Sequence, residues 1–193
     1  AHYPGLRVVV PSLASDAVGL LREAIQSGDP VVFLEPKSLY EAKLSRSRYP
    51  GPEYRVPFGA ARVAREGKDI TIVTYGNLWP RSMAAADKLS QEHGIEAEVI
   101  DLRTVDAGYD RSAVLKSLQK TNRIMVVDED RPIGSFGASV AAEIAQNHFA
   151  YLDGPIGRVH PKFCRVSYGP QGEKAVMPSP DDIVAEALRL VNY

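Results

Sequence analysis

The stretch ITIVTYG, residues 70–76, decides the fold because it is the clearest strand in the chain. Ile70 to Tyr75 are all β-branched or aromatic, and Gly76 ends the run, as is typical of a sheet strand. Apolar and polar residues alternate only weakly, so we expect both faces to be covered. Two more strand-like runs, AEVIDL (97–102) and RIMVVD (123–128), alternate with helical patterns, which predicts parallel strands joined by crossover helices. We therefore place 70–75 at the centre of a sheet.

Composition limits the function classes. The chain has 193 residues, of which 45% are hydrophobic and 24% charged, as in an ordinary globular protein. A net charge of -1 gives no reason to expect nucleic acid or an anionic membrane as a partner. No apolar run approaches the ~20 residues of a membrane span. A single cysteine, Cys164, fits a reducing compartment such as a bacterial cytoplasm or a mitochondrial matrix.

The first 35 residues form one strand, helix, strand unit. Ser15 is the expected N-cap of the helix, and Gly28 its stop. The expected inward stripe of this helix is Leu20, Leu21, Ala24 and Ile25. Such a unit is too small to fold alone, so we expect 1–35 to be the end of a larger domain whose beginning precedes Ala1.

Residues 36–57 read as an ordered, irregular linker, because they contain four prolines and a basic run, KLSRSR (43–48). That run is either a patch for phosphate or nucleic acid, or a solvated linker. A turn at 67–69 between the strand-like run 58–66 and strand 70–75 predicts an antiparallel pair, so the first strand should oppose the others.

Residues 58–193 are thus predicted to form an α/β domain. Its fold is a three-layer helix, sheet, helix arrangement with a five-stranded mixed sheet whose first strand is antiparallel. The fifth strand is expected at 156–159. Four helices are predicted from the residues at their ends. The first has Pro80 in its first turn and ends at Gly94, and the other three begin near Asp110, Ser135 and Ser179, the last with Pro180 at its first position.

Residues that could carry chemistry are few. The loop PIGSFGAS (132–139) could cradle phosphate, but it lacks a third fingerprint glycine, so a tight turn that lets helix and sheet approach is preferred. Asp128, Glu129 and Asp130 could bind a hard cation, or be solvated acids at a strand end. The residues themselves therefore indicate a fold but no catalytic or cofactor-binding side chain.

A family resemblance adds to this. The segments PGLRVVVPS, DPVVFLEPKSLY, VPFGAARVAREGKDITIVTYG, AEVIDLRT, GSFGASVAAEI and YLDGP occur in the order and spacing found in beta subunits of the thiamine-diphosphate-dependent 2-oxo acid dehydrogenases. The resemblance covers residues 4–193. It departs from the family at 105–110, where a proline-containing stretch is usual, and at 161–170.

The resemblance implies oxidative decarboxylation of a 2-oxo acid, with acyl transfer to lipoyl groups, by an assembled enzyme that binds thiamine diphosphate and Mg²⁺. The implied partners are an alpha subunit or domain, a second copy of the beta part, and a lipoyl acyltransferase. The family's cofactor-activating glutamate and substrate-facing histidine would precede Ala1, and the diphosphate contacts come from the alpha partner. The chain alone is therefore expected to be inactive and to serve assembly. Two alternatives remain for the function of the chain. It is part of a transketolase or deoxyxylulose-phosphate synthase, or it is a non-catalytic assembly module.

The resemblance also carries two sites over to this sequence. The resemblance implies a potassium site formed by carbonyl oxygens of Ala24, Ile25, Ser27 and Asp29, for which an ordinary glycine-stopped turn is the alternative. Asp153 and the C-terminal Tyr193 match positions that help dock the acyltransferase. A solvent-facing turn aspartate is the alternative for Asp153.

Overall fold

The computed structural model describes residues 1–165 and 168–193, so Val166 and Ser167 of the unusual 161–170 segment lie outside the described residues. The strands are β1 (Arg7–Val9), β2 (Val31–Phe33), β3 (Arg62–Arg65), β4 (Ile70–Thr74), β5 (Ala97–Asp101), β6 (Ile124–Val127) and β7 (Gly157–Val159). The α-helices are α1 (Ala14–Gln26), α2 (Trp79–His93), α3 (Arg111–Thr121), α4 (Phe136–Asn147), α5 (Pro170–Val176) and α6 (Pro180–Val191). Short 3₁₀ turns are η1 (Lys37–Leu39), η2 (Lys43–Ser45), η3 (Gly76–Leu78) and η4 (Phe149–Tyr151).

The main sheet has the strand order β3-β5-β4-β6-β7, which places β4 at its centre as predicted. β4 runs parallel to both neighbours, and Ile72 lies opposite Val99 of β5 and Met125 of β6. All five residues of β4 are buried, because helices cover both faces. The predicted α/β fold with a mixed five-stranded sheet is confirmed.

The first strand of this sheet is antiparallel, as expected, but its partner differs from the prediction. β3 pairs with β5 and not with β4, because both edges of β4 are already occupied by parallel strands. The turn at 67–69 bonds instead to the start of β5, where the Glu96 carbonyl accepts the amides of Lys68 and Asp69. A tight turn therefore connects two strands that are not neighbours.

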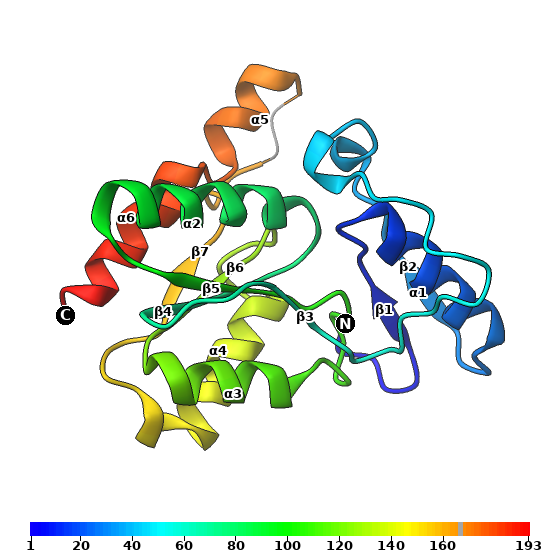
Figure 1. Ribbon diagram of the computed structural model, residues 1–193, viewed down its shortest axis with the longest axis horizontal. Coiled ribbons are helices and arrows are strands. Elements are labelled where there is room, and N and C mark those ends of the chain that lie inside the picture. The colour runs from blue at the N-terminus through cyan, green and yellow to red at the C-terminus, as the bar shows by residue number, and fades with distance from the viewer. Residues whose placement is uncertain (166–167) are drawn as a thin grey trace.

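Helices form the outer layers (Figure 1). α2 and α6 share one apolar core with the sheet, and α3 and α4 share another on the opposite face. The predicted caps are confirmed at Asp110, Ser135 and Ser179, and Gly94 ends α2 in a left-handed conformation.

The N-terminal unit lies beside the main domain (Figure 1) and consists of α1 and the parallel pair of β1 and β2. α1 begins at Ala14, one residue before the predicted cap, because the Asp16 carboxylate accepts the Leu13 amide at 3.2 Å. Leu20 is fully buried, but Leu21 is 47% and Ile25 76% exposed. The predicted inward stripe is therefore wrong at these two positions, since two strands cover only one side of the helix.

Within the described residues, no helix is both long and apolar enough to cross a membrane.

Candidate functional site

Five polar residues, of which four are buried and Arg62 is partly exposed, join the N-terminal unit to the carboxyl ends of β4 and β5. We call them the junction network, and its members are Ser12, Asp16, Arg62, Asp101 and Arg103. Arg103 donates to Asp16 at 3.0 Å, and Arg62 donates to Asp101 at 2.8 Å. Ser12 Oγ donates to Asp101 at 3.0 Å and accepts the Gly76 amide at 3.1 Å. The network therefore links α1 to the first residue of β3, the last residue of β5 and the turn that follows β4.

Charges in the junction network balance, with two carboxylates facing two guanidinium groups. Asp16 and Asp101 are 1% and 0% exposed, so neither carboxylate could remain charged there without a partner. Burial, with a smaller contribution from the nearby Asp16, raises the pKa of Asp101 to about 6 against the opposing effect of Arg62. Both acids are held by arginines, so the network orients the two parts of the molecule and offers no free acid or base.

Backbone bonds strengthen the same junction. The Val10 amide donates to the Arg103 carbonyl at 2.8 Å, and Val9 forms an antiparallel bridge with Thr104. The Asp106 carboxylate accepts the Val8 amide at 2.8 Å. The segment after β5, including the residues that depart from the family pattern, thus serves as the docking strand for β1.

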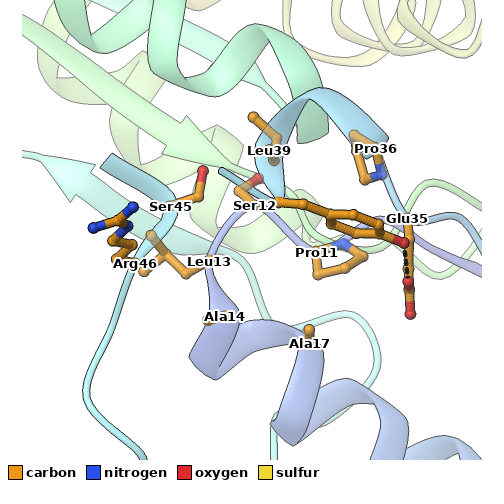
Figure 2. A pocket seen from close by; sticks show the side chains of 11 residues that line it. Pro11, Ser12, Leu13, Ala14, Ala17, Glu35, Pro36, Leu39, Ser45 and Arg46 are labelled. Atoms are coloured by element: carbon orange, nitrogen blue, oxygen red, sulfur yellow. Dashed lines mark hydrogen bonds between the residues drawn. The ribbon is translucent and has the colours of Figure 1, made fainter. Parts of the chain in front are cut away.

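A cavity of about 310 Å³ opens beside the first turn of α1, and we call it the α1 cavity. Figure 2 shows Ala14 and Ala17 of α1 below it, Ser45 and Arg46 at one side, and Glu35 and Pro36 at the other. The full lining is Pro11, Ser12, Leu13, Ala14, Ala17, Glu35, Pro36, Leu39, Tyr40, Ser45 and Arg46. Its walls are mainly apolar, with charged groups on two sides.

The three acids after β6, residues 128–130, differ in exposure, so the interpretation as solvated acids at a strand end does not hold for all of them. Asp128 is 1% exposed, whereas Glu129 and Asp130 are exposed. Both carboxylate oxygens of Asp128 lack a hydrogen-bond partner among the described residues, and burial raises its pKa to about 6. A Cβ on Gly137 would lie 1.9 Å from an Asp128 oxygen, so this glycine lets α4 approach the sheet. The close-approach interpretation of loop 132–139 is thus supported.

Two observations on the described residues weigh against a thiamine diphosphate held at the end of β4 by these residues alone. They contain no group of three or more His, Cys, Asp or Glu side chains that could hold a metal ion. A cavity of about 470 Å³ near the end of β4 is bordered by Glu129 and Asp130, whose charges would repel a diphosphate.

The four residues of the potassium turn lie at the end of α1. No hydrogen bond of the described residues uses the carbonyl of Ala24 or Ile25, and the last turn of the helix has no basic residue. The Ser27 hydroxyl accepts the Asp29 amide at 3.0 Å, and the Asp29 carboxylate lies 3.4 Å from Arg7. Unpaired carbonyls occur at every helix C-terminus and favour a cation in general, so the potassium site stays a prediction.

The two residues predicted to dock the acyltransferase lie at the same surface. A Cβ at Gly154 would lie 3.0 Å from the Tyr193 ring, so the turn that follows Asp153 packs on the C-terminal residue. Tyr193 is 76% exposed. The Asp153 carboxylate is 3.7 Å from Arg123, and the Asp153 amide donates to the Asn122 carbonyl.

Comparison with known families agrees with this architecture. Residues 59–183 match the family described as "Transketolase, C-terminal domain". The chain belongs to that family. Residues 1–43 match "Transketolase, pyrimidine binding domain".

Relatives of this family member include three kinds of beta subunit. It is 42% identical, over 96% of its length, to the beta subunit of acetoin:2,6-dichlorophenolindophenol oxidoreductase of Cupriavidus necator. It is 40% identical over 98% to the mitochondrial pyruvate dehydrogenase subunit beta-2 of Oryza sativa, and 39% over 100% to the 2-oxoisovalerate dehydrogenase subunit beta of Bacillus subtilis. It covers 54%, 50% and 58% of these relatives, or about half their length. The resemblance to 2-oxo acid dehydrogenase beta subunits is confirmed.

Solved structures support the fold alone. The structure titled "Split gene transketolase, inactive beta4 tetramer" superposes with a TM-score of 0.79 at 24% identity. The superposition covers 98% of this chain and 59% of that one. A transketolase mutant from Pichia stipitis gives 0.63 at 16% identity, with 98% and 25% covered.

Sequence reasoning missed the junction network and the α1 cavity. The residues of both come from distant segments, and those that lie in segments of the family resemblance stand in no motif that predicts a catalytic or ligand-binding site. The only available signal was the pair of oppositely charged residues in DLR, residues 101–103, directly after a buried strand.

Proposed function

We propose that this chain is part of the beta subunit of a thiamine-diphosphate-dependent 2-oxo acid dehydrogenase, and that it provides framework for subunit assembly and partner docking. The observation that carries this proposal is 39–40% identity to such beta subunits over 98–100% of the chain. The transketolase alternative is weaker, since its support is a shared fold at 24% identity or less.

The division of labour in the assembled enzyme follows from the site. Thiamine diphosphate and Mg²⁺ would be held by residues outside this chain, including an alpha subunit, and the acids that border the cavity near the end of β4 support this. Residues 1–35 would complete a pyrimidine-binding domain, 36–57 would be the linker, and 58–193 the transketolase-like domain. The matches at 1–43 and 59–183 support this division. The location would be a bacterial cytoplasm or a mitochondrial matrix.

Acetoin is a specific second candidate for the substrate. The 42% identical relative from Cupriavidus necator is named for acetoin, whereas others at 39–40% are named for pyruvate and 2-oxoisovalerate. These identities do not separate the three substrates, so the test below compares them directly.

The test uses the full-length subunit that contains this chain, coexpressed with the alpha subunit of the same genome. With thiamine diphosphate and Mg²⁺ present, we expect reduction of 2,6-dichlorophenolindophenol in the presence of pyruvate, 2-oxoisovalerate or acetoin, and none when the alpha subunit is omitted. Ketol transfer between sugar phosphates, with no dye reduction on any of the three substrates, would support the transketolase alternative instead.

Two subsidiary sites belong to this proposal. The first site would hold K⁺ at Ala24, Ile25, Ser27 and Asp29, so KCl should raise the melting temperature more than equimolar tetramethylammonium chloride. Equal effects of the two salts would contradict the potassium site.

The second site, Asp153 and Tyr193, would help dock the lipoyl acyltransferase, so Asp153→Asn should weaken that complex in a pull-down. Asp87→Asn, on the exposed side of α2, is the matched control. Pairing of two beta copies would show as a dimer or larger assembly by light scattering.

A further inference from the structure

The cavity of about 470 Å³ near the end of β4 lies where the loops after β4 and β6 diverge, and we call it the β4 cavity. β4 and β6 are adjacent parallel strands, with Thr74 opposite Val127. The chain leaves β4 towards α2 on one face of the sheet and leaves β6 towards α4 on the other face. In open α/β sheets, ligands bind in the crevice between such diverging loops at the carboxyl ends of the strands. The topology therefore marks the β4 cavity as a candidate ligand site.

The hydroxyl of Tyr75 is an independent sign of a ligand. Tyr75 follows β4, lines the cavity and is only 7% exposed. Within the described residues no hydrogen bond uses its hydroxyl, and that oxygen is not fully enclosed, in contrast to the carboxylate oxygens of Asp128. A buried tyrosine hydroxyl usually has a partner, as Tyr109 has in Glu143 at 3.1 Å. The Tyr75 hydroxyl is therefore open to a hydrogen bond from a ligand in the cavity.

The charge of the cavity is negative. Three of the described residues that line it are acids, Glu35, Glu129 and Asp130, and none has a basic side chain. Burial raises the pKa of Tyr75, and the charges of Asp128, Glu129 and Asp130 add to this effect, so these carboxylates lie near the Tyr75 hydroxyl. Negative charge beside a tyrosine oxygen favours a cation.

The neighbouring arginines compensate these acids only in part. Burial raises the pKa of Glu129 against the opposing charge of Arg81. The Asp130 carboxylate accepts the backbone amide of Arg131 at 2.7 Å, but the Arg131 guanidinium donates away from it, to the Lys162 carbonyl. A cation bound in the cavity would therefore balance charge that the chain leaves unbalanced.

The remaining walls limit the size and nature of that cation. Val10, Val105 and Phe136 supply apolar surface, and the volume lies within the range of roughly 300–1,000 Å³ typical of small-molecule sites. The Glu35 carboxylate already accepts the Tyr40 hydroxyl at 2.5 Å. The described residues contain no group of three or more His, Cys, Asp or Glu side chains for a metal ion. An organic cation with an apolar body fits these walls.

We propose that the β4 cavity binds a small primary amine, in its ammonium form, that carries a short apolar chain. The Tyr75 hydroxyl oxygen accepts a hydrogen bond from the ammonium group, and the carboxylates of Glu129 and Asp130 attract its charge. The apolar chain packs against Val10 and Val105. This site is separate from the proposed docking and potassium sites and does not depend on the dehydrogenase proposal.

The experiment is a saturation-transfer NMR titration of the chain at pH 7 with three probes. The Ala1 amine is acetylated, because Ala1 borders the cavity and its charge would compete with a bound cation. Butylammonium has the required charge and chain, 1-butanol has the same shape without charge, and methylammonium has the charge without the chain. We expect butylammonium to bind saturably, at least five-fold more tightly than either of the others. Comparable binding of 1-butanol or methylammonium, or no saturable binding of butylammonium, would overturn the proposal.

Variants locate the binding. Tyr75→Phe removes only the hydroxyl, and Asp130→Asn removes one exposed carboxylate, so both should fold and each should weaken butylammonium binding at least three-fold. Tyr109→Phe is the control for the first, because Tyr109 is a buried tyrosine that also packs on Phe136 but does not line the β4 cavity. Asp87→Asn, at an exposed position away from the cavity, is the control for the second. Losses in the controls equal to those in Tyr75→Phe and Asp130→Asn would place the binding elsewhere and overturn the proposal.

Discussion

Gly76 lies at the end of β4, where the chain turns towards α2 with a φ of +55°. A Cβ at this position would lie 2.6 Å from Cγ1 of Val10, in the docked N-terminal unit. Gly76→Ala should therefore lower the free energy of unfolding by about 2–4 kcal/mol, from left-handed strain and overpacking together. Gly94→Ala is the control, because Gly94 has a similar φ of +67° but open space around it. Urea denaturation measures both, and equal losses would show that Val10 does not press on this turn.

Asp101 gives a prediction about pH. Burial raises its pKa from 3.8 to about 6, so the folded protein binds this proton more tightly than the unfolded chain does. The resulting stabilisation is complete below pH 3.8 and is lost as the pH rises through 6. Asp101→Asn lacks this titration, so from pH 7 to pH 4 the wild type should gain stability relative to the variant by up to about 3 kcal/mol. A pH series of urea denaturations measures the difference, and a constant difference would refute the raised pKa.

Local residue signals were readable in the sequence, whereas contacts between distant residues were not. Asp110, Ser135 and Ser179 cap their helices as predicted, because capping involves residues only three apart. Arg103 and Asp16 are 87 residues apart, and Ser12 and Asp101 are 89 apart. Neither periodicity nor motif spacing contains that information, so the junction network became visible only in the folded chain.

At the level of elements, the sequence identified the strands of the main sheet but not the whole order of pairing. Hydrophobic runs mark β4, β5 and β6 directly. The partner of β3 depends on which strand edge is left free, and a short turn gave the wrong answer. α5 was not predicted, because its seven residues include a glycine and show no helical stripe.

α6 offers a test of one element. The Ser179 hydroxyl accepts the Asp182 amide at 3.2 Å, and the Asp182 carboxylate accepts the Ser179 amide at 2.8 Å. Ser179→Ala should lower the free energy of unfolding by about 1 kcal/mol. Ser112→Ala, at an exposed position in the first turn of α3 with no side-chain bond, should change it by less than about 0.5 kcal/mol. Thermal denaturation followed by circular dichroism compares the two, and similar values would indicate that the cap contributes nothing.

For the whole molecule, the junction network should couple the two parts of the chain. Arg103→Met leaves Asp16 buried without its closest cation, which should cost about 3–5 kcal/mol. Amide hydrogen exchange should accelerate in residues 7–33 more than in β6. Arg189→Met is the control, because that half-exposed arginine pairs with a neighbour on its own helix.

A double replacement separates the charge from the shape of the site. Asp16→Asn with Arg103→Met removes the unpaired charge and should recover part of the lost stability. One contrary result is that the double variant loses more free energy of unfolding than the two single variants lose when added together, and another is that amide exchange in residues 7–33 is unchanged. Either result would show that the network does not couple the two parts.

The docking of β1 against the segment after β5 has a consequence for gene recombination. A crossover that falls in the linker would join an N-terminal part from one parent with a main domain from another. Such a hybrid would need to inherit Ser12 and Asp16 with a matching Arg62, Asp101 and Arg103, since a mismatch between the acids and the arginines leaves an unpaired charge in the interior. Shuffling libraries should accordingly yield stable hybrids where these five positions agree between parents, whatever the identity elsewhere.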